Sequence, residues 1–91
     1  MKRLWAKIYK DNRLIQDMTA HITDGEWEYD VVEESMDAFH EICNELDIEH
    51  PMWLEANKEE FKKREKTSFS HNNFIEEPKF DMMEIDVIET R

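Results

Sequence analysis

The sequence predicts a small α+β protein in which an antiparallel sheet packs against two helices, in the order β-β-α-α-β. Two patterns lead to this prediction. Residues 4–22 alternate apolar and polar side chains with a period of two, as strands do, and residues 30–46 carry an apolar stripe on a 3.6-residue period, as helices do. A chain of 91 residues has room for one hydrophobic core, so we expect a single acidic domain over residues 1–91.

The first predicted element is a β-hairpin over residues 4–22. Its arms flank the polar segment Asp11-Asn12-Arg13, where asparagine tolerates the left-handed backbone that a tight turn requires. A three-residue loop there pairs Lys10 with Leu14 and puts the even-numbered side chains of both arms on one apolar face. A two-residue loop would bring Asp17 into that face, so the burial pattern favours the three-residue loop.

A helix is expected to follow from about Asp30 to Leu46, with its stripe packed on the hairpin. The stripe consists of Val32, Met36, Phe39, Cys43 and Leu46. After Pro51, a second helix is expected to begin at Asn57, which would cap it, and to end near Lys66.

The last predicted strand runs from Phe80 to Ile88. We expect it beside the first arm of the hairpin, which leaves the second arm at an edge of the sheet. The pattern leaves the conformation of residues 67–79 open, although Phe69, Phe74 and Ile75 should be buried there.

Charge is the most unusual feature of the composition. The formal net charge is −11, and residues 14–57 hold thirteen carboxylates with no lysine or arginine. Such a chain repels nucleic acid and anionic lipid, so neither is an expected partner. The first helix should turn an acidic face to solvent, made of Glu33, Glu34, Asp37, Glu41 and Glu45.

The sequence shows neither a membrane span nor a signal peptide, because no apolar run is long enough. The chain's single cysteine, Cys43, cannot form an intramolecular disulfide, which favours a cytoplasmic location.

No motif predicts catalysis or a cofactor. Cys43 and His40 are both of a type that binds zinc, but a zinc site needs further ligands, and the remaining histidines are not spaced to supply them. Cys43 is better explained as a small apolar member of the buried stripe.

Trp5, Tyr9 and Ile15 should point away from the predicted helices. If nothing covers that side of the sheet, they form an exposed apolar patch of the kind that marks a partner surface. The alternative is that the C-terminal segment or the second helix covers them.

Several short segments together resemble a set of short bacterial proteins. They are Leu4-Trp5-Ala6-Lys7-Ile8, Lys10-Asp11-Asn12-Arg13, Pro51-Met52-Trp53-Leu54, Phe61, Lys66-Thr67, Asn73-Phe74-Ile75-Glu76, and Phe80-Asp81 to Ile88. The resemblance covers most of the chain. That family has no assigned activity or ligand, so the resemblance implies a cytoplasmic one-domain protein and no particular chemistry.

The sequence is compatible with three functions. The first is a non-enzymatic interaction module that binds another protein or a second copy of itself, through the open sheet face and the edge strand. The second is an acidic decoy or antagonist of a basic nucleic-acid-binding protein, suggested by the carboxylate-rich stretch. The third is a small metal protein or enzyme, for which the sequence offers no converging polar groups.

Overall fold

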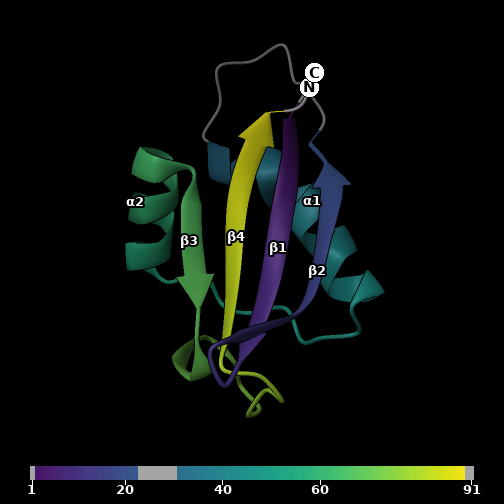
Figure 1. Ribbon diagram of the computed structural model, residues 1–91. Helices are drawn as coiled ribbons and strands as arrows, with labels where there is room; N and C mark the ends of the chain where they lie inside the picture. Colours follow the sequence, from purple (N-terminus) through teal and green to yellow (C-terminus); the bar gives the residue numbers. More distant parts are fainter. Residues whose placement is uncertain (1, 23–30, 90–91) are drawn as a thin grey trace.

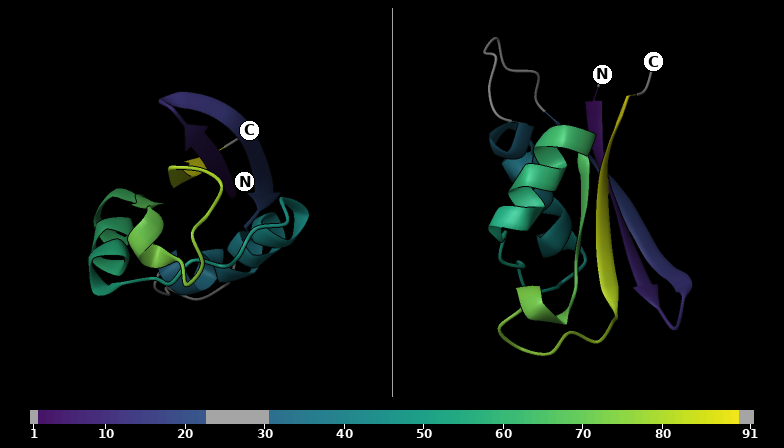
Figure 2. Two further views of the ribbon diagram at one scale, coloured as in Figure 1. Left: turned by 90° about the horizontal axis from the view of Figure 1, so that it is seen from below. Right: turned by 90° about the vertical axis from the view of Figure 1, so that its left-hand side faces the viewer.

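The computed structural model describes residues 2–22 and 31–89, and these residues form two layers (Figures 1 and 2). One layer is a four-stranded antiparallel sheet in the order β2-β1-β4-β3, and both helices lie on the same face of it. The elements are β1 (Lys2–Lys10), β2 (Arg13–His21), α1 (Val31–Glu45), α2 (Glu55–Arg64), β3 (Lys66–Phe69), the short 3-10 helix η1 (His71–Asn73) and β4 (Met82–Glu89). The predicted fold class is confirmed, as is the place of the last strand beside β1 with β2 at an edge.

The hairpin differs from the prediction at its turn. Asp11 and Asn12 both have positive φ, 53° and 64°, and they form a two-residue turn between Lys10 and Arg13. Further from the turn, Ile8 pairs with Gln16, which is the pair predicted by the three-residue loop. A β-bulge reconciles the two, because β2 has one extra residue, Ile15, between the partners of Ile8 and Tyr9.

The core lies between the sheet and the helices. Leu4, Ala6 and Ile8 of β1 are buried against α1, whose Phe39 and Cys43 are also buried, as the apolar stripe predicted. Four aromatic rings meet in this layer, with centroids 5.2–5.5 Å apart in the contacts Phe39–Trp53, Phe39–Phe69 and Trp53–Phe69, and 5.3 Å in Trp53–Phe61. Neither described helix is long and apolar enough to cross a membrane.

The second helix begins earlier than predicted, and Asn57 is not its cap. The residue before the helix is Leu54, and Asn57 lies within the first turn, where its Oδ1 accepts the Leu54 N–H at 3.1 Å. The same amide donates from Nδ2 to Thr67 Oγ1 and to the Ser68 carbonyl, at 3.0 and 2.8 Å. The Asn57 side chain therefore bonds to the N-cap backbone of α2 and also fastens α2 to β3.

Strand β3 and the segment after it fill the region whose conformation the sequence left open. Phe69 and Phe74 are buried as expected, but Ile75 is 82% exposed, so its predicted burial is wrong. The N–H groups of Ile75 and Glu76 both donate to the Glu49 carboxylate, at 2.9 and 3.2 Å. Backbone bonding holds this turn against the α1–α2 connection, and that leaves the Ile75 side chain outside the core.

Candidate interaction surface

The sheet face turned away from the helices has no described helix over it (Figure 2). Residues paired across antiparallel strands have their side chains on the same face of the sheet. The strand register therefore identifies the residues of β2 and β4 that lie beside the outward side chains of β1. We call this surface the open face: Trp5, Lys7, Tyr9, Leu14, Asp17, Thr19, Met82, Glu84 and Asp86.

In the middle of the open face, charged side chains pair with one another within the chain. The Lys7 ammonium lies 2.8 Å from Glu84 Oε1 and 3.2 Å from Asp86 Oδ2, and 4.2 Å from the centroid of the Trp5 ring. Burial lowers the pKa of Lys7, but the hydrogen bonds and charges of the two carboxylates outweigh it and raise the pKa above its ordinary value. Trp5 Nε1 also donates to Asp17 Oδ2 at 3.0 Å, so the indole is held both by this hydrogen bond and by the Lys7 ammonium.

At the hairpin end, the open face is apolar. Tyr9 is half-buried between Leu14 of β2 and Met82 of β4, its partners on either side. Leu14 is 49% exposed and Ile15 is 54% exposed. The bulge is the reason, because it pairs Leu14 with Tyr9 on the open face, whereas the alternation predicted Leu14 on the buried face.

The structure places the three predicted partner-surface residues at different points of the β1–β2 hairpin. Lys7 stands between Trp5 and Tyr9 along β1, and Ile15 occupies the bulge. Leu14 and Met82 are the apolar neighbours of Tyr9 that sequence reasoning missed. The Asp11-Asn12 pair was the available signal, because two residues tolerant of positive φ favour a two-residue turn and hence a shifted register near it.

Among the residues that the structure describes, no strand pairs with the outer edge of β2. The Ile22 N–H donates to the Lys2 carbonyl at 3.0 Å, which makes this pair a hydrogen-bonded one. Because such pairs alternate along an antiparallel ladder, the backbone groups of Asp17, Thr19 and His21 point away from the sheet. The opposite edge, β3, has only four residues, so β2 is the longer template for another strand.

The predicted acidic face lies elsewhere on the molecule. Asp37, Glu41 and Glu45 are exposed on α1, in the helix layer, whereas the side chains of Glu33 and Glu34 lie outside the part of the chain that the structure describes. The acidic flank of α1 and the open face are therefore separate surfaces.

The structure does not bring His40 and Cys43 together as ligands. Cys43 is fully buried, whereas His40 is exposed and stacks on His50 with ring centroids 4.9 Å apart. Within residues 2–22 and 31–89, no three His, Cys, Asp or Glu side chains are grouped to hold a metal ion. Burial raises the pKa of the Cys43 thiol to about 12.

Cys43 should therefore resist thiol reagents in the folded protein. The thiolate is the reactive form, and at mildly alkaline pH a thiol with this pKa is almost fully protonated as well as enclosed. Reaction with a chromogenic disulfide should be slow in native buffer and fast in denaturant. Because Cys43 is the chain's single cysteine, the signal has no other source, and fast labelling of the native protein would contradict its burial.

Comparison with known protein families, curated proteins and solved structures finds no match to this chain. The resemblance to short bacterial proteins therefore stays a prediction.

Proposed function

We propose that the protein is a non-enzymatic interaction module that pairs with a second copy of itself along β2. The observation that carries the proposal is the outward row of backbone groups at Asp17, Thr19 and His21, on a long edge strand beside an open sheet face. Two copies joined in this way would share one continuous sheet, with the helices of both on the same side.

The side chains of β2 are suited to pairing with themselves. An antiparallel arrangement about a two-fold axis at Thr19 places Asp17 of each copy across from His21 of the other, an acid opposite a base. An axis at Asp17 would set the two Asp17 side chains against each other. The register centred on Thr19 avoids this like-charge pair and is therefore favoured.

The test is the oligomeric state of a proline variant. Thr19→Pro removes an N–H that points away from β1, so the hairpin keeps its own ladder bonds while the edge loses a donor. Sedimentation equilibrium over a range of concentrations should show a dimer for the natural chain and a monomer for Thr19→Pro. Thr19→Ala, which keeps the N–H, should remain dimeric.

Two outcomes would overturn the proposal: a natural chain that stays monomeric at the highest concentration, or a Thr19→Pro variant that is folded by circular dichroism and dimerises equally well. Salt separates this function from the acidic-decoy alternative. Two chains that each carry a formal net charge of −11 repel, so salt should strengthen their association, whereas it would weaken binding to a basic protein.

A further inference from the structure

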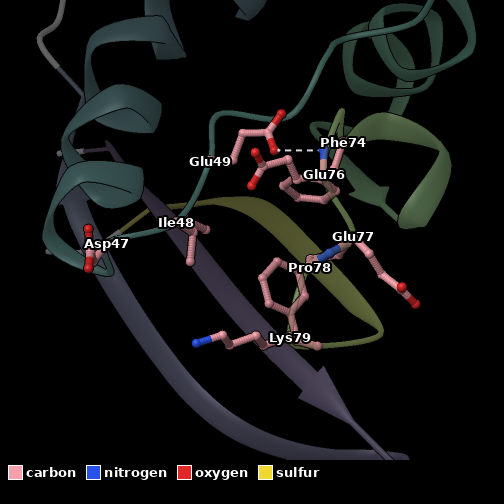
Figure 3. Close-up of a pocket in the computed structure, with 9 residues that line it drawn as sticks. Asp47, Ile48, Glu49, Phe74, Glu76, Glu77, Pro78 and Lys79 are labelled. Carbon is pink, nitrogen blue, oxygen red and sulfur yellow. Dashed lines mark hydrogen bonds between the residues drawn. The ribbon is translucent and has the colours of Figure 1, made fainter.

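A pocket of about 250 Å³ lies between the α1–α2 connection and the segment that joins β3 to β4 (Figure 3). It is separate from the β2 edge. Its lining residues are Asp47, Ile48, Glu49, Phe74, Glu76, Glu77, Pro78, Lys79 and Phe80. Residues 47–49 and 74–80 are far apart in the sequence, and they face each other only in the folded chain.

The pocket has an apolar wall and an acidic rim. Phe74 and Phe80 meet edge to face with ring centroids 5.5 Å apart, and Ile48 packs from the other side against the core. Four carboxylates and one ammonium complete the lining. An occupant must therefore offer both an apolar surface and a positive charge.

The walls are held in place before any ligand arrives. Glu49 accepts the N–H groups of Ile75 and Glu76, and the His71 Nε2 lies 3.2 Å from the Phe80 carbonyl. On the other wall, the Ile48 N–H donates to the Cys43 carbonyl at 3.0 Å, which fixes the turn at the end of α1. A preformed site of this kind loses little entropy on binding.

The carboxylates do not suit a metal ion, because no three of the described ones are grouped to hold one. The volume is below the range typical of drug-sized ligands but is enough for one long side chain. Guanidinium groups stack on aromatic rings and bond carboxylates through two parallel N–H groups, so they match both parts of the lining.

We propose that this pocket binds an arginine side chain presented by a partner protein, with its alkyl stem on Phe74 and Phe80 and its guanidinium at the carboxylate rim. Among these lining residues, Glu49 already accepts two backbone N–H groups, and the Glu77 side chain points away from the other carboxylates in Figure 3, which leaves Glu76 and Asp47 to bind it. The chain's own Lys79 also lines the pocket, so its ammonium reduces the negative charge there (Figure 3).

The test is a titration of the full chain with Nα-acetyl-arginine amide, followed by amide chemical shifts. Shifts should be confined to the pocket, with Ile48 and Phe80 moving and Thr19 unmoved. Nα-acetyl-citrulline amide, which has the same shape without the charge, should cause none.

Variants test the assignment in both directions. Glu76→Gln should weaken binding about tenfold, as expected for one lost charge-assisted hydrogen bond, and Asp47→Asn should weaken it in the same way. Lys79→Met should strengthen binding by removing a positive charge from the pocket lining. Glu59→Gln removes the same charge from the exposed face of α2, away from the pocket, and should change nothing.

Equal shifts with the citrulline amide would overturn the proposal, as would shifts spread over the acidic flank of α1. The same holds if Glu59→Gln weakens binding as much as Glu76→Gln, because the attraction would then be to net charge alone. Tighter binding of Nα-acetyl-lysine amide would rule out the guanidinium assignment.

Discussion

Replacing Asn57 with alanine is expected to lower the free energy of unfolding by about 3 kcal/mol, although the residue lies in a short, mostly solvated helix. The Asn57 amide makes four hydrogen bonds in a buried site, accepting from Leu54 N–H and from Asn73 Nδ2 at 2.9 Å, and donating to Thr67 and Ser68. Alanine would remove all four and leave several of the partners without a replacement.

The substitution should weaken contacts beyond α2, because the hydrogen-bond network of Asn57 joins segments that are distant in the sequence. Asn73 Nδ2 also donates to the Met52 carbonyl at 2.8 Å, and Asn73 Oδ1 accepts the Ser70 N–H at 3.1 Å. Chemical denaturation followed by far-ultraviolet circular dichroism measures the change. The matched control is Asn72→Ala, since Asn72 is exposed in the same short helix as Asn73.

An isosteric variant separates hydrogen bonding from packing. Asn57→Asp keeps the shape but cannot donate to Thr67 or Ser68, and it sets a carboxylate against the Ser68 carbonyl. It should destabilise the protein at least as much as alanine does. A loss below about 1 kcal/mol in both variants would show that the network contributes little.

Replacing Phe39 with alanine is expected to cost about 4 kcal/mol, the largest loss from any single truncation we predict. Phe39 is 1% exposed, and its ring contacts those of Trp53 and Phe69 in the core between the helices and the sheet. The change removes a large apolar surface and leaves a cavity that α1 cannot fill, because α1 is already pinned by its other buried residues. For a domain of this size, the loss is a large part of the total stability.

Denaturant midpoints and slopes for Phe39→Ala and Phe39→Leu distinguish the cavity from a general loss of hydrophobicity. Leucine fills part of the volume and should recover more than half of the loss. Met52→Ala, at a side chain 45% exposed, is the surface control and should have a small effect. A Phe39→Ala variant as stable as the Met52→Ala control would mean that α1 does not pack on the sheet as described.

The elements that can be predicted from the sequence are those in which a local pattern of burial repeats. Strict alternation in the hairpin predicted the pairs of Leu4 with Ala20 and of Ala6 with Met18, and both are present. The stripe on the first helix predicted the burial of Phe39 and Cys43. These features are readable because burial on one face repeats every two residues in a strand and every 3.6 in a helix.

Near the turn, two local rules compete, and only the folded chain decides between them. The burial pattern required Asp17 opposite Lys7, whereas Asp11 and Asn12 favoured a two-residue turn. A bulge at Ile15 satisfies both and moves Leu14 to the open face. The alternation of apolar and polar residues does not show where the extra residue lies, because the residues on the two sides of the bulge alternate in the same way.

By itself, the sequence determined the fold class, the hairpin pairing away from its turn and the face of the first helix that is buried. Tertiary structure alone decided that Asn57 bonds to β3 as well as to the N-cap backbone of α2, that β3 exists, and that residues 47–49 and 74–80 enclose a pocket. The physical reason is that periodic burial produces a pattern among neighbouring residues, which the sequence displays. The hydrogen bonds of a buried amide and the walls of a pocket depend instead on partners that lie elsewhere in the chain.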